Sequence, residues 1–596
     1  MSRSEVLALY EERLKERERE KERRRKDVAI VSYARIAVFV AGIALLWFVW
    51  EMDRQSWPLL FAPLAVFAAL LFVHLRLHDV LMRTERAERF YRRGIERLTE
   101  SWRGKGRTGE NFLERDHPYA RDLDIFGKGS LFELLSTTVS DWGTATLAEW
   151  LKRPARRELV RGRQEAIAEL RPLLELREQA ATELVDEPEI DDPDALIRWA
   201  ETPRVLGPGA GRWAALAIGA ATTTLAVLWL ASRVDRVAFL SALAVASSFA
   251  MFFWARARRV LAAAEGPVRD LSVVASLLEI LEREGFTSAP LVALQSRLAS
   301  GGEPASKRIR RLARLVELLD ARRNQLFSPI AALLLWGTQF AFALEAWRAR
   351  SGPAVRRWLE AVGELDCLLA LSGYAFENPD DPPPEIAEEK ALFDAEGLGH
   401  PLIPHARLVR NDVKLGGELR LIVVSGSNMS GKSTLLRAIG VNTVLAVAGA
   451  PVRARKLRLS LLQVAASIRI EDSLQDGISH FYAEILRLRQ IMELANGDES
   501  VLFLLDEILH GTNSHDRRIG AEAVVRGLVE RGAIGLITTH DLALSRLAET
   551  MAGQATNVHF EDQIVEGKVQ FDYRMREGVV KKSNALELMR AIGLEV

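Results

Sequence analysis

Four long apolar segments interrupt a sequence that is otherwise charged and helical in pattern. Two of them, 213–231 and 237–255, contain no charged residue. An earlier pair, 28–50 and 58–75, is also strongly apolar, although the first of these contains Arg35. Each segment approaches the roughly 20 residues that a helix needs to cross a bilayer. The pattern predicts two transmembrane helical hairpins, with four buried helices of a soluble domain as the alternative.

Basic residues mark the outer ends of both hairpins, and the two connecting loops contain few. The run "KERRRK" (21–26) precedes the first apolar segment. Further arginines follow the second and the fourth segments: Arg83, Arg86, Arg89, Arg92 and Arg93, and then Arg256, Arg258 and Arg259. Because cytoplasmic flanks carry an excess of Lys and Arg, both hairpins should enter from the cytoplasmic side. The sequence therefore predicts an integral protein of a bacterial-type inner membrane, with membrane lipid as a partner and a cytoplasmic C-terminal domain.

A fifth apolar run, 326–344, also lacks charges but includes Pro329, Gly337, Thr338 and Gln339. A fifth crossing would put everything after it on the side opposite to the first helix. The polar and helix-breaking residues also suit a lipid-facing helix poorly. We expect a buried helix here, with a membrane-embedded one as the alternative.

The remaining segments divide the chain into charged, helical and mixed regions. Acidic and basic residues alternate at the start, which is typical of a solvated helix with i,i+4 pairs. The proline-rich "ENPDDPPPE" (377–385) indicates a domain boundary. Beyond it, short apolar runs alternate with helical stretches, which predicts a mostly parallel sheet covered by helices. The expected order is a charged helix 1–27, hairpin 28–77, basic helix and linker 78–117, helical region 118–204, hairpin 205–260, helical region 261–385 and α/β domain 386–596.

Composition adds few constraints. A chain of 596 residues is too long for one core and should form several domains. The formal net charge is zero, from 80 basic and 80 acidic residues, so no overall positive charge points to nucleic acid. The single cysteine, Cys367, has no partner for an intrachain disulfide. No small-residue cleavage site follows the charged N-terminal helix, so we expect no removable signal peptide.

The segment "GSNMSGKS" (426–433) matches the phosphate-binding pattern G-x-x-x-x-G-K-[ST] completely and lies between a predicted strand and a predicted helix. In such a loop, backbone N–H groups surround phosphate oxygens, the lysine neutralises phosphate charge and the hydroxyl binds Mg²⁺. Lys432 therefore also counts as catalytic, and Ser433 as a metal ligand. The expected ATP-binding residues are Gly426, Ser427, Asn428, Met429, Ser430, Gly431, Lys432, Ser433 and Thr434.

Two later strands also end in polar residues. "VLFLLDEI" (501–508) is an apolar strand that ends in Asp506, a candidate Mg²⁺ ligand, and Glu507, a candidate for polarising the attacking water. "LITTHD" (536–541) ends in His540, which could sense the γ-phosphate or position that water. Together with the phosphate loop, these strand ends predict an ATP hydrolase that uses Mg²⁺.

The motifs of residues 397–594 together resemble the ATPase domain of the MutS family of DNA mismatch-repair proteins, within the ABC ATPase superfamily. "GSNMSGKST" is similar to that family's G-P-N-M-G-G-K-S-T, "DEILHGTNS" to its D-E-I-G-R-G-T-S-T and "ITTHD" to its strand-end T-H. Upstream, "GSLFELLSTTVSDWGTATLAEWLKRP" and "RQEAIAEL" are similar to the start of its helical core. The resemblance implies an α/β P-loop ABC-type ATPase domain at the C-terminus. An all-α core and lever region and the two transmembrane hairpins precede it.

The resemblance also implies further nucleotide contacts. "GISHFYAEI" (477–485) stands where the family has an S-T-F-x-x-E segment, so Ser479 is expected to reach the γ-phosphate bound by a partner subunit. Leu408 or Val409 stands where the family packs a side chain on adenine. The implied assembly is a homodimer with ATP between its two subunits.

The N-terminal part departs from the family. Its repair members read mismatches with a Phe-x-Glu motif in an N-terminal domain, whereas "NFLE" (111–114) lies in a short linker and matches by coincidence. The leading hypothesis is a membrane-anchored MutS-like ATPase without a mismatch-reading domain, which moves helical arms and binds DNA weakly and without sequence preference at most. An ABC-type transporter half is a second hypothesis, disfavoured by four spans and the lack of an L-S-G-G-Q signature. A nucleotide-gated membrane scaffold without DNA binding is the third.

Overall fold

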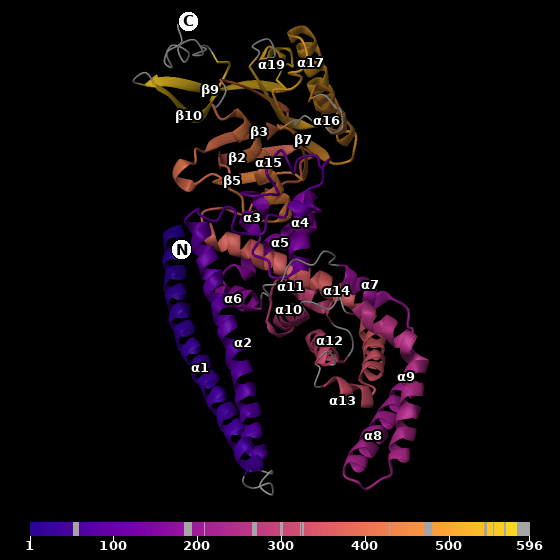
Figure 1. The fold of residues 1–596 in the computed structure, drawn as a ribbon. Helices are drawn as coiled ribbons and strands as arrows, with labels where there is room; N and C mark the ends of the chain where they lie inside the picture. The colour runs from indigo at the N-terminus through magenta and orange to yellow at the C-terminus, as the bar shows by residue number, and fades with distance from the viewer. Residues whose placement is uncertain are drawn as a thin grey trace. The chain divides into compact units, whose positions relative to one another are not determined.

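The structure is a computed structural model of the 596-residue chain (Figure 1). It describes residues 1–51, 59–183, 194–207, 209–264, 271–298, 302–321, 324, 327–427, 430–469, 480–540, 545–551, 553–565 and 568–580. The chain forms two compact units. The first unit contains residues 1–137, 147–174 and 368–596, and the second contains residues 138–146 and 175–367.

The first unit begins with two long antiparallel helices, α1 (Arg3–Glu51) and α2 (Phe61–Leu98), which lie side by side in Figure 1. The charged segment 1–27 is therefore not a separate helix, because α1 runs from it into the first apolar segment without a break. Ion pairs join the charged halves in register: Arg25 with Glu85 at 3.1 Å, Lys21 with Glu88, and Glu18 with Arg92 at 3.3 Å.

Aromatic side chains pack between the start of α1 and the end of α2. Tyr10 and Tyr91, each about 1% exposed, belong to one cluster of buried side chains, and their ring centroids lie 5.6 Å apart. Gly94 of α2 makes this approach possible, because a Cβ atom there would lie 2.4 Å from Cε2 of Tyr10. The apolar halves of both helices instead expose their side chains, with Ile30, Trp47 and Phe61 each more than half exposed.

Shorter helices complete the N-terminal part of the first unit. They are η2 (Glu110–Phe112), α3 (Leu131–Leu135) and α5 (Arg157–Leu170), and α4 (Asp141–Lys152) contributes its second half. The carboxylate of Asp122, in the segment before α3, accepts the backbone N–H groups of Ile468 and Arg469 at 2.7 and 2.8 Å. This buried contact fixes the N-terminal segment to the C-terminal α/β domain.

Among its described residues, the regular elements of the second unit are all helices. Its elements are α6 (Leu174–Thr182), α7 (Ala195–Glu201), α8 (Ala210–Leu230), α9 (Arg236–Ala264), α10 (Leu271–Arg283), α11 (Ala289–Ser296), α12 (Ala305–Asp320), α13 (Ser328–Leu333) and most of α14 (Trp336–Glu377). Helices α8 and α9 pack on each other as a hairpin. Within the described ranges, four helices, α1, α2, α8 and α9, are long and apolar enough to cross a membrane by length and composition.

The fifth apolar run, 326–344, does not form the single helix that was expected. It divides into α13 and the start of α14 at Leu335, whose φ of +52° lies in the left-handed region. The freed carbonyl oxygen of Leu334 accepts a hydrogen bond of 2.6 Å from the side-chain amide of Gln339. Ala341, Phe342 and Leu344 are buried, whereas Ile330 is 49% exposed. Among the described residues, neither of the helices that this run forms is a candidate to span a membrane.

The C-terminal α/β domain contains two sheets. A mixed four-stranded sheet has the order β1 (Glu385–Ile386), β5 (Lys456–Leu459), β2 (Leu392–Leu398), β3 (Asn411–Gly416). A six-stranded sheet has the order β10 (Lys568–Glu577), β9 (Ala555–Val565), β4 (Leu421–Ser425), β8 (Ile534–Thr539), β7 (Ser500–Asp506), β6 (Leu462–Ser467). It is parallel except for β10, so the predicted mostly parallel sheet is present.

Helices cover both faces of the six-stranded sheet, which explains why its central strands β4 and β8 are buried at every position. On one face, Phe503 and Leu505 pack with side chains of α16 (His480–Leu494) and α17 (Ser514–Glu530). On the other face, Leu504 points to α15 (Lys432–Ala448), where a Cβ atom at Gly440 would lie 2.9 Å from it. The short helix α19 (Leu547–Thr550) and the turn η4 (His405–Arg407) complete the domain.

Candidate nucleotide-binding site

Strand order brings three polar strand ends together. Strand β8 lies between β4 and β7, and all three are parallel, so their carboxyl ends lie at one edge of the sheet. Ser425 pairs with Thr539, and Asp506 pairs with Thr538. The phosphate loop after β4, the acids at the end of β7 and His540 after β8 are therefore neighbours.

The phosphate loop has the backbone shape that its glycines allow. Gly426 and Gly431 have φ values of +148° and +107°. A Cβ atom at Gly426 would lie 2.9 Å from the carbonyl oxygen of Phe560, and one at Gly431 would lie 3.1 Å from the ring of Tyr573. Any other residue at Gly431 would be strained and would press on that ring. Helix α15 starts at Lys432, so its N-terminal N–H groups face the loop.

Lys432 connects the two ends of the phosphate loop through hydrogen bonds to its backbone. Its ammonium group donates to the carbonyl oxygens of Gly426 and Ser427 at 2.9 and 2.8 Å, and the side chain is 5% exposed. Burial lowers the pKa of Lys432 from its usual value, and the negative charges of Glu507 and Asp506 act against that shift. A phosphate group bound in the loop would oppose the shift in the same way, because it also favours the charged amine.

The acids at the end of β7 are held by the neighbouring strand. The hydroxyl of Thr538 donates a short hydrogen bond to Oδ1 of Asp506, and the N–H of Glu507 donates to that hydroxyl at 3.0 Å. The backbone then turns sharply, with φ values of +47° at Glu507 and +60° at Leu509. Left-handed residues other than glycine cost about 1–2 kcal/mol each, so the surrounding contacts must hold this turn in place.

Two histidines hold opposite oxygens of the Glu507 carboxylate. His540 makes a short contact with Oε1, and Nε2 of His510 lies 3.1 Å from Oε2. The hydrogen bond from His540 is the largest influence that lowers the pKa of Glu507 below its ordinary value, with burial acting against it. His540 also lies 3.4 Å from the ammonium nitrogen of Lys432. Lys432, Glu507 and His540 therefore form one polar cluster, in which His510 was not expected.

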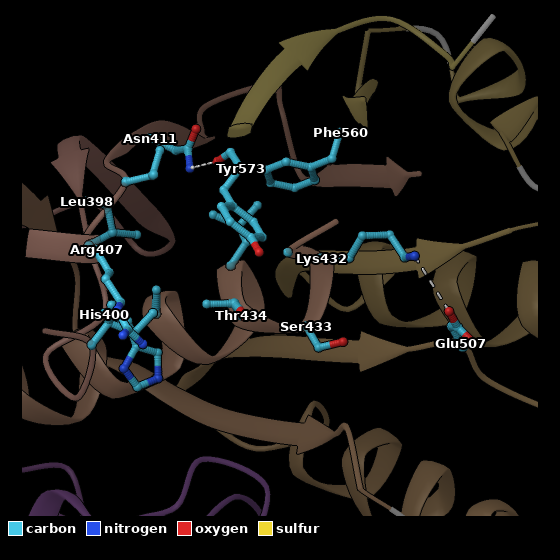
Figure 2. A pocket seen from close by; sticks show the side chains of 16 residues that line it. Leu398, His400, Arg407, Asn411, Lys432, Ser433, Thr434, Glu507, Phe560 and Tyr573 are labelled. Carbon is cyan, nitrogen blue, oxygen red and sulfur yellow. Dashed lines mark hydrogen bonds and ion pairs between the residues drawn. The ribbon is translucent and has the colours of Figure 1, made fainter. Parts of the chain in front are cut away.

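A cavity of about 380 Å³ extends from this cluster, and Figure 2 shows its two different ends. Lys432, Ser433 and Glu507 lie at one end, and Leu398, His400 and Arg407 lie at the other. Gly431, Thr434, Phe560, Tyr573 and further side chains complete the lining. Burial and nearby arginines lower the pKa of His400 to about 4, so the ring is neutral at neutral pH. The cavity therefore has charged side chains at both ends, Lys432 and Glu507 at one and Arg407 at the other, with mostly uncharged residues between them.

The structure places the remaining predicted residues as follows. Val409 lines the cavity, whereas Leu408 packs its Cδ atoms against Gly399 and is not in the lining. Ser430 is buried and donates to the carbonyl oxygen of Ser427 at 2.8 Å. Asn428, Met429 and Ser479 lie outside the described residues, so their predicted contacts with ATP remain predictions.

Sequence reasoning missed the aromatic wall formed by Phe560 and Tyr573. Both residues come from the β9–β10 hairpin, more than a hundred residues after the phosphate loop. Asn411 fixes Tyr573 at a bulge in that hairpin: its amide donates to the carbonyl oxygen of Tyr573 at 3.0 Å and accepts the N–H of Met575 at 2.8 Å. No local pattern in the sequence shows that this hairpin lies beside β4 and next to the phosphate loop.

The described residues suit a nucleoside triphosphate with Mg²⁺. The hydroxyl oxygen of Ser427 is buried and has no hydrogen-bond partner among the described residues, as expected for a group that faces phosphate. Ser433 and Asp506 supply the hydroxyl and carboxylate oxygens that Mg²⁺ prefers. In the part of the chain that the structure describes, no cluster of three or more His, Cys, Asp or Glu side chains could hold a metal by itself.

Comparisons with known proteins agree with this geometry. Residues 422–595 match the family model described as MutS domain V. The endonuclease MutS2 of Thermus thermophilus is 33% identical over 249 residues, which cover 41% of this chain and 32% of that protein. The DNA mismatch repair protein MutS of Brevibacillus brevis is 32% identical over 257 residues, which cover 42% of this chain and 29% of that protein.

The matched region is thus about a third of the length of these curated relatives. A mostly helical N-terminal region is followed in this chain by a mixed α/β domain, and the match to the family model lies in that second part. With its phosphate loop, acidic strand end and strand-end histidine at one edge of a parallel sheet, the C-terminal part of this chain is a domain V, the ATPase domain, of the MutS family.

Proposed function

We propose that the chain hydrolyses ATP with Mg²⁺ at the site formed by Lys432, Glu507 and His540. The observation that carries this proposal is the meeting of these three side chains at the phosphate-loop end of a cavity large enough for a nucleotide. Lys432 binds β- and γ-phosphate oxygens, and Glu507, kept ionised by His540, accepts a proton from the attacking water. Ser433 and Asp506 would hold Mg²⁺, which neutralises phosphate charge when it is bound.

The site is proposed to work in a homodimer. This proposal extends the resemblance to MutS, which implies that Ser479 of one subunit reaches the nucleotide bound by the other; in the sequence, Ser479 directly precedes α16. Binding of ATP between two subunits would favour the closed pair, and hydrolysis would release it, so that the helical regions move as arms. Sedimentation of Glu507→Gln with ATP should give a dimer, and with ADP a larger share of monomer.

The second element of the proposal is a membrane anchor made of α1, α2, α8 and α9. Support comes from the outward-facing apolar side chains of these helices, such as Met251 and Leu230, which are 82% and 75% exposed. Apolar surfaces of this extent are unfavourable in water and favourable in lipid. Helix α1 carries the charged segment 3–27 between the α/β domain and the apolar half. At 1.5 Å per residue, that segment holds the ATPase about 36 Å from the membrane surface.

DNA binding is proposed only in a weak form without sequence preference. The curated relatives bear the names of a mismatch-repair protein and an endonuclease, but the matched region leaves out most of their length. Binding to duplexes with and without a mismatch, over a range of salt concentrations, tests this point. Equal and strongly salt-dependent affinities agree with the proposal, and preference for the mismatch contradicts it.

One preparation tests the enzymatic and membrane claims together. Membranes that contain the full chain are washed with high salt and alkaline carbonate, and ATP hydrolysis is measured in the pellet and in the wash. We expect ATPase activity to stay in the pellet and to be abolished by Lys432→Ala. Activity in the wash would contradict the anchor, and activity that survives Lys432→Ala would contradict the site.

A further inference from the structure

Residues 400–407 form a wall between two cavities of the first unit. On one side, His400, Ile403 and Arg407 line the nucleotide cavity. On the other side, Ile403 and His405, with their neighbours, line a second and smaller cavity. Ile403 belongs to both linings, so the wall is one residue thick at this point. Any displacement of this wall segment therefore changes the shape of the nucleotide cavity.

The start of α1 closes the second cavity. The Nη1 atom of Arg3 lies 2.6 Å from Nδ1 of His405 and donates to the side-chain oxygen of Asn378 at 3.1 Å. Its Nη2 atom donates to the carbonyl oxygen of Leu98, at the end of α2, at 3.1 Å. One guanidinium group thus joins the start of α1, the end of α2 and the wall segment.

The residues after α2 hold the same segment through its backbone. Oε1 of Glu100 accepts the N–H of His405 at 2.7 Å, and Nη2 of Arg103 donates to the carbonyl oxygen of Leu402 at 2.5 Å. Upstream of Glu100, Arg97 makes two hydrogen bonds of 2.6 and 2.8 Å to the carboxylate of Glu377 at the end of α14. The start of α1 and the end of α2, which lie together, are therefore both fixed beside the wall segment.

Arg453 supports His405 from within the α/β domain. Its guanidinium makes a short contact with the His405 ring, donates to Asn378 at 3.1 Å and pairs with Asp381 at 3.1 Å. Burial and the charges of Arg453 and Arg3 lower the pKa of His405 to about 4, while Glu100 acts against that shift. A neutral imidazole has one acceptor nitrogen and one N–H, so it accepts a hydrogen bond from one of the two guanidinium groups, and it adds no third positive charge beside them.

We propose that Arg3, at the start of α1, and Glu100, just after the end of α2, are positioning residues for the nucleotide cavity. They hold the wall segment 400–407 in place. The position of the α1–α2 helix pair against this segment therefore controls the affinity for the nucleotide. The inference rests on the proposed ATP site and names what regulates it. Because the wall segment lies at the end of the cavity away from Lys432 and Glu507, the control acts on KM and leaves kcat nearly unchanged (Figure 2).

The test compares Arg3→Ala, Glu100→Ala and Arg3→Lys with the wild-type full chain in membranes or detergent. Arg24→Ala is the matched control, because Arg24 pairs only along α1, with Glu20 at 3.5 Å among the described contacts. Two kinds of measurement are made: the KM and kcat for ATP, and hydrogen exchange, without nucleotide, of the backbone amides of the non-proline residues in 401–407. The exchange measurement does not depend on ATP hydrolysis. Thermal melting shows that each variant is folded.

We expect Arg3→Ala and Glu100→Ala to raise KM about tenfold, because each removes a charge-assisted hydrogen bond, with kcat within about twofold. The amide of His405 should exchange faster in both, Arg3→Lys should restore part of the affinity, and Arg24→Ala should match the wild type. Unchanged exchange in the two alanine variants overturns the inference, whatever the ATPase does. If the two alanine variants exchange faster but the wild-type protein itself does not bind ATP, the positioning role stands and the proposed function is contradicted. If Arg3→Ala does not fold, Glu100→Ala alone decides.

Discussion

The ammonium nitrogen of Lys432 lies 3.7 Å from Oε1 of Glu507, although the two residues follow different strands. They meet because β8 lies between β4 and β7 and holds His540 at its own end. The candidate phosphate-binding cation, Lys432, and the candidate base, Glu507, therefore form one charge pair. Phosphate in the loop would compete with Glu507 for Lys432, which leaves the carboxylate to His540 and to water.

Replacing Glu507 by Gln should separate binding from hydrolysis. The amide keeps the size of the carboxylate but accepts no proton, so we expect kcat to fall about 10²–10⁴-fold. The affinity for ATP should stay the same or increase, because a negative charge near the phosphates is removed. Single-turnover hydrolysis and equilibrium binding measure the two quantities. An unchanged rate would show that another group activates the water.

The two histidines around Glu507 should contribute unequally. His540 contacts Oε1 and also approaches Lys432, whereas His510 contacts only Oε2 and is 43% exposed. We expect His540→Ala to lower kcat about 100-fold and His510→Ala less than about tenfold. Steady-state kinetics of the two variants checks this order. A larger loss in His510→Ala would reverse the assignment.

The acidic limb of the pH–rate profile should depend on His540. Its hydrogen bond lowers the pKa of Glu507 from 4.5, so the carboxylate stays charged as the pH falls to that value and below. The stability gained from this interaction is present above pH 4.5 and is lost as the pH falls through the lowered pKa. In His540→Ala the pKa of Glu507 should rise. The acidic limb of the residual kcat should then shift to higher pH than in the wild type.

The ring of Tyr573 should contribute to nucleotide affinity through its face. It lines the cavity and lies against Gly431. We expect Tyr573→Ala to raise Kd for ATP about tenfold, in line with the value of base–aromatic stacking, and Tyr573→Phe to leave Kd nearly unchanged. Fluorescent nucleotide binding measures both. Equal loss in the two variants would mean that the hydroxyl, not the ring, makes the contact.

Gly94 should be needed for packing of the α1–α2 pair. Because a Cβ atom there would lie 2.4 Å from the buried ring of Tyr10, Gly94→Ala should destabilise the first unit by about 1–3 kcal/mol. Gly285→Ala is the control, since no described atom lies within 4 Å of a Cβ atom at that position. Chemical denaturation and limited proteolysis of residues 1–98 compare the two. Equal stability would show that Tyr10 moves aside without cost.

The sequence by itself determined the features that depend on local order. Period and length indicated the helices and parallel strands, and four of the predicted apolar segments are helices long enough to cross a membrane. The spacing of Gly426, Gly431 and Lys432 between a strand and a helix predicted a phosphate loop. The acids at the end of β7 and the histidine after β8 predicted the polar groups that lie beside it. These features were readable because each is set by residues within a few positions of each other.

Tertiary structure decided the contacts that cross long stretches of chain. The order of strands, which no local pattern specifies, put Tyr573 against Gly431 and His540 against Glu507. The apolar run 326–344 is interrupted at Leu335, whose backbone has a left-handed conformation. A leucine side chain disfavours that conformation, so local sequence does not predict it. Arg3 reaches His405 because two long helices fold back on each other. An arginine at the start of a charged helix looks like any other solvated charge, and only packing gives it a partner.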